Sequence, residues 1–368
     1  MILERLSILN YKNIEQAELT LSPKINCFLG SNGMGKTNLL DAIYYLSFCK
    51  SYSNPIDSQN IRHDADFAVI QGFYKLDERP EEIFCSLRRR QKKQFKRNKK
   101  EYERLSDHIG LLPVIMISPS DTELINGGSE ERRKFIDTFL SQFDKEYLNS
   151  LISYNKALQQ RNALLKTDGY IDDTLLDLWD DQIVAEGQII YEKRKTFIEQ
   201  FIPTFQKFYN HICSSNEEVS LAYESHFGKG DFRDILQQRR SKDKILGYTS
   251  VGVHKDDLEM QMDGYAIKRV GSQGQNKTYV VALKFAQFDF LRKVGSTTPI
   301  MLLDDIFDKL DASRVEKIIS LVLDNDFGQI FVTDTNREHL DEILSNTQTN
   351  YHLYEVDKGE VTQKRPAK

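Results

Sequence analysis

The sequence predicts an α/β protein with mixed sheets and an inserted, mainly helical second lobe. Three patterns within the 368 residues support this. An apolar strand passes through a glycine-rich loop into a helix in residues 25–47, helical spacing dominates residues 130–212, and strand patterns return near residue 248. We expect residues 1–120 and 248–368 to form one lobe and residues 121–247 to form the insertion.

The N-terminal segment, residues 1–29, indicates a small antiparallel sheet. Apolar residues recur along residues 3–9 and 17–21, with a turn at residues 10–13 between them. A further apolar strand, residues 25–29, then leads directly into the glycine-rich loop.

The glycine-rich loop has the composition of a phosphate-binding loop. Its glycines let backbone N–H groups gather around a phosphate, and the helix that follows directs its positive end at the anion. We expect Lys36 to reach the β- and γ-phosphates of ATP and the Thr37 hydroxyl to hold Mg²⁺. A glycine-rich turn without function is the alternative, which the flanking strand and helix disfavour. The expected nucleotide-binding residues here are Gly30, Ser31, Asn32, Gly33, Met34, Gly35, Lys36 and Thr37.

Residues 61–117 indicate further strands, and residues 88–100 are the most basic stretch of the chain. An Asn-Lys turn within this stretch predicts a hairpin. Two interpretations stay open: a solvated edge hairpin that lysines protect from aggregation, or a surface that contacts nucleic-acid phosphates. The candidate DNA-binding residues are Arg88, Arg89, Arg90, Lys92, Lys93, Lys96 and Arg97.

The insertion is predicted to be helical from about residue 130 to 212, and its apolar stripes are explained by mutual packing. We expect a long helix over residues 174–211 to break near Pro203, and residues 166–169 to link two helices. A strand at residues 219–223 and a helix at residues 232–242 follow.

Strand character returns with alternating apolar residues at 258–262 and a hairpin turn at Asp263 and Gly264. A second glycine-containing loop, residues 271–275, opens an apolar helix. Residues 299–305 form a buried strand that ends in Asp304 and Asp305, although a surface turn is the alternative. A helix at 312–323 and a strand at 330–334 follow, and the polar tail past Lys358 is expected to fray.

These acids suggest a division of roles. Asp304 is expected to hold Mg²⁺ together with Thr37, while Asp305 orients and deprotonates the attacking water. Lys36 and Asp305 are therefore the candidate catalytic residues.

The order of phosphate loop, helical insertion, second glycine loop and acid-tipped strand resembles the ABC ATPases. The resemblance implies an ABC-type P-loop ATPase head in which two subunits enclose two nucleotides. Ser272 of one chain would then cap the γ-phosphate bound by Lys36 of the other. The signature residues that would bind nucleotide are Ser272, Gln273, Gly274 and Gln275.

Two departures from wider ABC proteins affect the expected rate. Asp305 replaces their usual glutamate, and Thr333-Asp334 stands where many carry a sensor histidine. We therefore expect slow ATP hydrolysis that serves as a switch.

Blocks along nearly the whole chain resemble the RecF family of bacterial recombinational-repair ATPases. They comprise residues 9–13, 30–51, 118–137, 252–258, 271–275 and 302–305. Lys255 stands where the family commonly has Arg, Val253 where it has Pro, and Asp41 where Glu is more frequent. His254 and Lys255 are either structural or contact DNA or phosphate, with the structural role favoured for the histidine.

This second resemblance implies an ATP-driven homodimer that binds gapped DNA or junctions between single-stranded and double-stranded DNA. With RecO and RecR, it would promote RecA loading, and a weak, DNA-stimulated ATPase activity would release it.

Composition limits the compartment and the partners. The net charge of −5 means that DNA would need a local basic surface. Four cysteines lack metal-type spacing, and neither a signal pattern nor a membrane-length apolar run is present, so we expect a cytoplasmic protein. The alternatives are an ABC transporter's nucleotide-binding subunit, a P-loop kinase acting on a small metabolite, and a non-catalytic scaffold with structural ATP.

Overall fold

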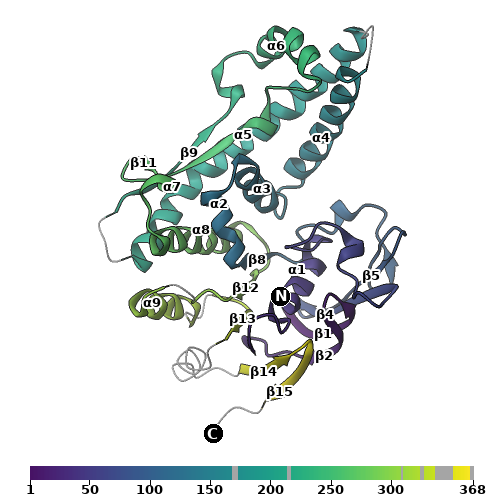
Figure 1. Ribbon diagram of the computed structural model, residues 1–368, viewed down its shortest axis with the longest axis vertical. Coiled ribbons are helices and arrows are strands. Elements are labelled where there is room, and N and C mark those ends of the chain that lie inside the picture. The colour runs from purple at the N-terminus through teal and green to yellow at the C-terminus, as the bar shows by residue number, and fades with distance from the viewer. Residues whose placement is uncertain (168–172, 214–216, 308–309, 324–326, 336–350, 365–368) are drawn as a thin grey trace. The chain divides into compact units, whose positions relative to one another are not determined.

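A computed structural model describes residues 1–167, 173–213, 217–307, 310–323, 327–335 and 351–364 (Figure 1). The chain forms two compact units. Unit 1 comprises Met1–Asp121 and Lys284–Lys368, and unit 2 comprises Thr122–Leu283. The chain thus leaves unit 1 close to the expected first boundary but re-enters it after residue 283, whereas the sequence predicts re-entry at residue 248.

The first sheet of unit 1 is antiparallel, with strand order β2-β1-β4-β5-β6-β7. The predicted hairpin in the basic stretch is confirmed: Asn98 and Lys99 form the turn between β6 and β7 with φ values of 49° and 68°. The strands are β1 (Ile2–Tyr11), β2 (Ile14–Thr20), β4 (Phe67–Leu76), β5 (Arg79–Arg88), β6 (Gln94–Arg97) and β7 (Lys100–Glu101).

The second sheet of unit 1 has the order β15-β14-β3-β13-β12-β8 and is parallel except for β15. All five residues of β12 are buried, as the apolar pattern predicts for a parallel strand. The strands are β3 (Ile25–Leu29), β8 (Val114–Ile117), β12 (Ile300–Asp304), β13 (Ile330–Asp334), β14 (Tyr351–Asp357) and β15 (Glu360–Lys364).

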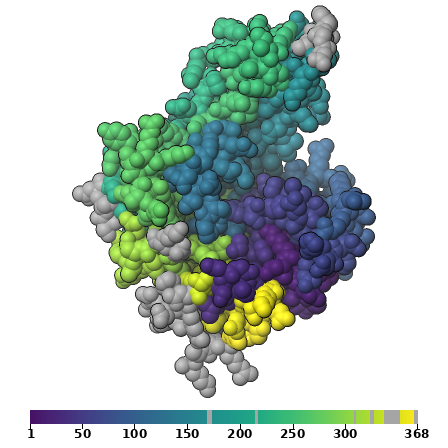
Figure 2. Space-filling view, in the orientation of Figure 1, coloured from purple at the N-terminus to yellow at the C-terminus, as the bar shows by residue number. Residues whose placement is uncertain are grey.

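Two predictions about unit 1 are wrong. The strand β3 does not join the N-terminal antiparallel sheet but lies between β13 and β14 in the parallel one. The tail past Lys358 is not frayed over residues 360–364, because β15 pairs with β14 and packs beside β2 at the surface (Figure 2). Its polar sequence suits an exposed edge strand, which needs one hydrogen-bonded neighbour and little apolar surface.

Helix α1 (Lys36–Phe48) follows the glycine-rich loop and packs against strands of both sheets. Leu39, Leu40 and Ile43 are fully buried in the core that these sheets enclose. Helix α9 (Ala312–Leu323) confirms the predicted helix after β12.

Unit 2 combines helices with a three-stranded antiparallel sheet of order β11-β10-β9. The long helices α4 and α5 lie side by side (Figure 1). The helices are α2 (Glu123–Asn126), α3 (Ser129–Leu140), α4 (Lys145–Leu165), α5 (Asp173–Ile212), α6 (Phe232–Leu246) and α7 (Ile267–Val270), with α8 (Gln273–Val294) beginning here and ending in unit 1. The strands are β9 (Val219–Glu224), β10 (Asp257–Met262) and β11 (Tyr265–Ala266).

This sheet explains the late boundary between the units. The strand β9 precedes residue 247 and β10 follows it, yet the two pair along their whole length. Residues 248–283 therefore stay with the helices of unit 2. The predicted turn between β10 and β11 is confirmed, with φ of 51° at Asp263 and 78° at Gly264.

The predicted break of the long helix is wrong, since α5 continues through Pro203. A proline removes one hydrogen-bond donor of the helix. Phe201 and Phe205 on either side of it are fully buried, and this packing holds the helix together across the missing bond. The predicted link at residues 166–169 falls partly outside the described residues.

Candidate nucleotide-binding site

The phosphate loop runs from the end of β3 to the start of α1, and two of its glycines have no room for a side chain. A Cβ atom at Gly30 would lie 2.3 Å from the Val356 carbonyl oxygen. Gly35 has a φ of 114°, and a Cβ there would lie 2.7 Å from Asn13 Oδ1. The loop therefore passes close to neighbouring backbone and to Asn13 in a conformation that other residues would strain.

Asn13 supports this loop from the turn between β1 and β2. Its Nδ2 donates to the Met34 carbonyl oxygen at 3.1 Å, and its Oδ1 accepts from Asn38 Nδ2 at 2.7 Å. The backbone N–H of Gly359 also donates to the Met34 carbonyl, at 2.8 Å. Sequence reasoning assigned Asn13 only to a turn. Its place within the family block of residues 9–13 was the available signal.

Lys36 lies over the loop. Its ammonium donates to the carbonyl oxygens of Gly30 at 2.8 Å and Ser31 at 3.3 Å, and the residue is only 4% exposed. A buried ammonium needs compensating acceptors. Phosphate oxygens held by the loop N–H groups would supply stronger ones, so this position suits a counter-charge for bound phosphates.

Thr37 and Asp304 meet although they are far apart in sequence. The Thr37 hydroxyl lies 3.0 Å from Asp304 Oδ1 and 2.9 Å from Oδ2. Burial raises the pKa of the Asp304 carboxyl above its ordinary value, and hydrogen bonds from Thr333 and Thr37 oppose that shift. A hydroxyl and a carboxylate are oxygen donors of the kind that Mg²⁺ prefers, so the two residues fit the expected metal.

Asp305 follows at the end of β12 in a left-handed conformation, with φ of 45°. Its backbone N–H donates to Thr333 Oγ1 at 3.1 Å. A non-glycine residue with this φ is uncommon, and such strain gathers at functional sites. The two sequence-predicted acids therefore lie together at the carboxyl end of the parallel sheet, beside the phosphate loop.

Asp41 on α1, a departure from the family pattern, is fully buried and well satisfied. It accepts from the Tyr11 hydroxyl at 2.5 Å and from the Tyr52 N–H at 2.6 Å. The Ser51 hydroxyl and the Lys12 ammonium add contacts at 2.8 Å and 2.6 Å. This network fixes the helix that carries Lys36 and Thr37, and sequence reasoning did not find it.

A second buried cluster lies in unit 1 where the chain leaves it and re-enters it. Lys284 Nζ lies 2.8 Å from Asp121 Oδ1, and both side chains are less than 10% exposed. The Tyr52 hydroxyl donates to the same Asp121 oxygen at 2.5 Å. The cluster joins the residue at which the chain leaves unit 1 to the residue at which it returns. The backbone N–H of Tyr52 connects this cluster to Asp41 on α1.

The loop at residues 271–275, which the sequence predicts to be the signature loop, lies in unit 2, whereas the phosphate loop lies in unit 1. Ser272 and Gln275 form a capping box: Ser272 Oγ accepts from the Gln275 N–H at 3.2 Å, and Gln275 Oε1 accepts from the Ser272 N–H at 2.7 Å. Gln275 Nε2 also donates to Glu217 at 2.6 Å. Gln275 is thus turned into its own unit, while Ser272 and Gln273 are exposed.

His254 has structural partners. The Tyr154 hydroxyl lies 2.8 Å from Nδ1, and the Thr249 carbonyl lies 3.0 Å from Nε2. Burial lowers the pKa of His254 to about 4, so the ring is neutral near pH 7 and supplies no cation to a phosphate. Lys255 is exposed, with its ammonium 5.4 Å from the centre of the Tyr248 ring.

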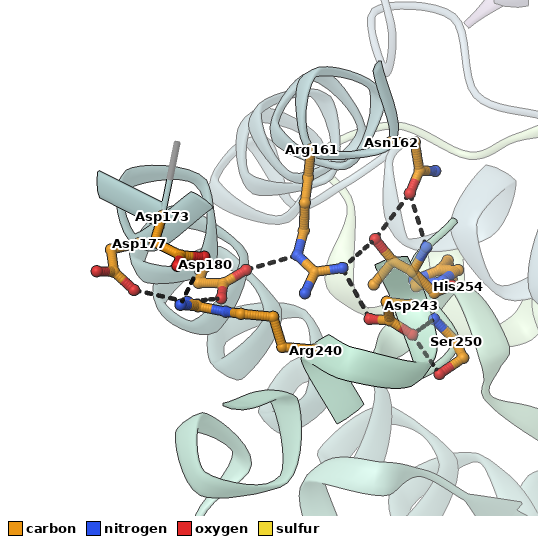
Figure 3. A network of polar contacts seen from close by, with 10 residues as sticks. Arg161, Asn162, Asp173, Asp177, Asp180, Arg240, Asp243, Ser250 and His254 are labelled. Atoms are coloured by element: carbon orange, nitrogen blue, oxygen red, sulfur yellow. Dashed lines mark hydrogen bonds and ion pairs between the residues drawn. The ribbon is translucent and has the colours of Figure 1, made fainter. Parts of the chain in front are cut away.

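Two fully buried arginines secure the helices around this block. Arg161 on α4 donates to Asp180 on α5 at 2.5 Å and to Asp243 on α6 at 2.8 Å (Figure 3). Arg194 on α5 is paired with Asp256 at 2.9 Å and donates to the Val253 carbonyl at 3.0 Å. These contacts indicate that residues 249–257 fasten helices to one another.

Several side chains of the basic stretch have partners within the chain, and several are exposed. Lys93 is committed internally, since its ammonium lies 2.6 Å from the Cys49 carbonyl and 3.0 Å from Asp57. Arg97 makes a two-pronged ion pair with Glu81 at 2.7 and 2.8 Å, and Arg89 donates to the backbone of residues 62–65. Lys96 lies over the Phe84 ring. Exposed side chains are those of Arg88, Arg89, Arg90 and Lys92.

Comparison with known proteins decides the family. The model of the RecF/RecN/SMC N-terminal domain family matches residues 2–362. A Phocaeicola vulgatus protein named "DNA replication and repair protein RecF" is 62% identical over 367 residues, covering 99% of each chain. The chain belongs to the RecF family. A RecF of Porphyromonas gingivalis is 50% identical over 366 residues, 99% of this chain and all of the relative.

Solved structures agree with this assignment to the RecF family. A RecF–ATP structure from the RecFOR pathway has a TM-score of 0.88 at 27% identity, covering 99% of this chain and 98% of the other. An Smc head bound to a domain of ScpA has a TM-score of 0.59 at 16% identity, covering 100% and 98%, which shows a shared fold. Among the described residues, no helix has the length and apolar character to span a membrane.

Proposed function

We propose that this RecF-family protein is an ATP-dependent DNA-binding protein of recombinational repair, with ATP hydrolysis as its switch. The observation that carries the proposal is the contact of Thr37 with Asp304 beside Lys36. It places a phosphate counter-charge and an oxygen pair suited to Mg²⁺ at the end of one parallel sheet. The family assignment favours this function over a transporter subunit, a metabolite kinase or a scaffold.

In the proposed reaction, the loop N–H groups and Lys36 bind the phosphates of ATP. Thr37 and Asp304 would hold Mg²⁺, and its positive charge would neutralise charge on the phosphates. Asp305 orients the attacking water and accepts its proton. Because its side chain is one methylene shorter than glutamate, we infer slow hydrolysis that releases the protein from DNA.

The second half of the anion pocket is proposed to come from another copy of the chain. The Ser272 hydroxyl accepts from the Gln275 N–H, so its own proton stays available to a γ-phosphate oxygen. Closing two chains over ATP would create the DNA-binding form, which acts in the cytoplasm with RecO and RecR to promote RecA loading. Four buried free cysteines are compatible with that reducing compartment.

The experiment that tests this function is sedimentation of the purified protein with and without ATP and gapped duplex DNA. We expect a monomer without ATP, a dimer with ATP, and a dimer–DNA complex when both are present. A monomer under all four conditions would contradict the proposal.

Ser272→Ala is expected to spare ATP binding by the monomer but weaken the ATP-dependent dimer by about a hundredfold or more, because each dimer loses two hydrogen bonds to charged oxygens, each contributing at least about 1.5 kcal/mol. Light scattering against protein concentration measures the change. Ser241→Ala, at an exposed position of α6 in the same unit, is the matched control. Equal dimerisation of the two variants would reject the role given to Ser272.

The DNA contact is proposed to involve the exposed basic residues. The double variant Arg90→Ala/Lys92→Ala is expected to weaken DNA binding and to reduce the slope of log K against log salt by about 0.9 per lost phosphate contact. Fluorescence anisotropy at several salt concentrations measures this. The control is Lys75→Ala/Arg79→Ala, which removes one charge from the end of β4 and one from the start of β5, where these two strands are connected. An unchanged slope in Arg90→Ala/Lys92→Ala would favour the protective-hairpin interpretation.

A further inference from the structure

We propose that Thr333 is a positioning residue for the nucleotide site, which holds Asp304 and Asp305 in their working arrangement. Thr333 lies in β13, directly beside Asp304 in the parallel register with β12. The inference rests on the proposed ATPase function and assigns a task to the position where many ABC proteins carry a sensor histidine.

One hydroxyl makes both contacts. Thr333 Oγ1 donates to Asp304 Oδ1 at 2.7 Å and accepts the backbone N–H of Asp305 at 3.1 Å. A threonine hydroxyl has one proton and two lone pairs, so it serves both partners at once. Thr333 has no exposed surface, so its hydroxyl is directed at these protein partners and not at solvent.

The contact with Asp304 occupies Oδ1 and leaves Oδ2 for a metal. Thr37 bonds to both carboxylate oxygens, and that is the contact a cation between the two residues would replace. The Thr333 bond comes from the neighbouring strand and falls on Oδ1, so Oδ2 is the oxygen that a cation beside Thr37 would take. This bond therefore keeps the carboxylate aimed at Thr37 whether or not Mg²⁺ is bound.

The contact with Asp305 supports a strained turn. The left-handed φ of 45° at Asp305 sets the direction in which its side chain leaves the strand. The partly buried backbone N–H of Asp305 needs an acceptor, and in this conformation of the turn the Thr333 hydroxyl supplies one. Without the hydroxyl, we expect the turn to relax and Asp305 to lose its alignment with the attacking water.

The test compares Thr333→Val, which keeps the shape and removes the hydroxyl, with Thr333→Ser, which keeps the hydroxyl. A fluorescent ATP analogue is titrated with and without Mg²⁺, and ATP turnover is measured separately. For Thr333→Val we expect unchanged affinity without Mg²⁺, because Lys36 and the loop are intact. The factor by which Mg²⁺ tightens binding should fall about 10- to 100-fold, as should the turnover rate, with both restored in Thr333→Ser.

A wild-type Mg²⁺ effect on binding in Thr333→Val would overturn the inference, as would a serine variant no better than valine. Thr333→Ala is the second variant should valine prevent folding, which a thermal melt detects. Lys36→Ala distinguishes failure of the proposed nucleotide site from failure of the positioning role of Thr333. If it binds the analogue normally, the proposed nucleotide site fails; if only Thr333→Val behaves like wild type, the positioning role alone fails.

Discussion

Lys36→Ala is expected to lower ATP affinity at least a hundredfold, which would abolish binding at micromolar nucleotide. The substitution removes the buried ammonium that lies over the loop, 2.8 Å from the Gly30 carbonyl. A hydrogen bond to a charged partner contributes up to about 3 kcal/mol, and Lys36 can bond to both terminal phosphates. Isothermal titration calorimetry with ATP measures the loss.

The matched control for Lys36 is Lys75→Ala in the same unit. Lys75 pairs with Glu78 on the surface, and its side chain is 39% exposed. Its loss should leave ATP affinity unchanged. An ATP affinity in Lys36→Ala equal to that of the control would contradict the assignment of the phosphate loop.

Arg194→Ala is expected to destabilise unit 2 by about 3–5 kcal/mol, the usual cost of removing one partner of a buried ion pair. The guanidinium donates to the Tyr147 hydroxyl at 3.0 Å and to Asp137 at 2.7 Å, besides its pairing with Asp256 at 2.9 Å. Asp256 would be left with a buried charge. Hydrogen exchange of the α5 amides measures the effect, because the two units need not unfold together.

Arg233→Ala is the control for Arg194. Arg233 forms an ion pair with Asp181, but the two side chains are 47% and 56% exposed, so its removal should cost less than about 1 kcal/mol. Similar losses of protection in both variants would show that the buried network does not determine the stability of unit 2.

The parts of the site that consist of consecutive residues could be predicted from the sequence. A phosphate loop is predicted by Gly35, Lys36 and Thr37. A metal-binding acid is predicted by the apolar strand that ends in Asp304. Neither pattern reveals that Thr37 and Asp304 touch, but parallel strands bring their carboxyl ends to one edge, and the structure agrees.

Side-chain partners other than the pair of Thr37 and Asp304 could not be predicted from the sequence. Lys93 belongs to a basic run, yet its ammonium bonds at 2.6 Å to the carbonyl oxygen of Cys49, which lies 44 residues earlier in the chain. Gln275 belongs to a signature loop, yet its amide bonds to Ser272 and Glu217. Charge density and motif order give residue types, whereas only the fold decides which of them have partners.

The predictions of a frayed polar tail and of a boundary at residue 248 differ from the structure for a related reason. The strand β15 has almost no apolar pattern. It needs none, because backbone hydrogen bonds to β14 hold it in the sheet. The pairing of β9 with β10 joins segments on either side of residue 247. Side-chain periodicity can indicate a strand such as β10, but it does not say which strand will pair with it.

The ion pair of Asp121 with Lys284 has an evolutionary implication. Since the chain departs and returns at two residues that touch each other, the stretch between them can change in length or design at little entropic cost to unit 1. Unit 1 is in this respect a constant base to which the inserted stretch is attached. Proteins of this family could therefore differ in the stretch between Asp121 and Lys284 while the surrounding sheets of unit 1 keep their arrangement.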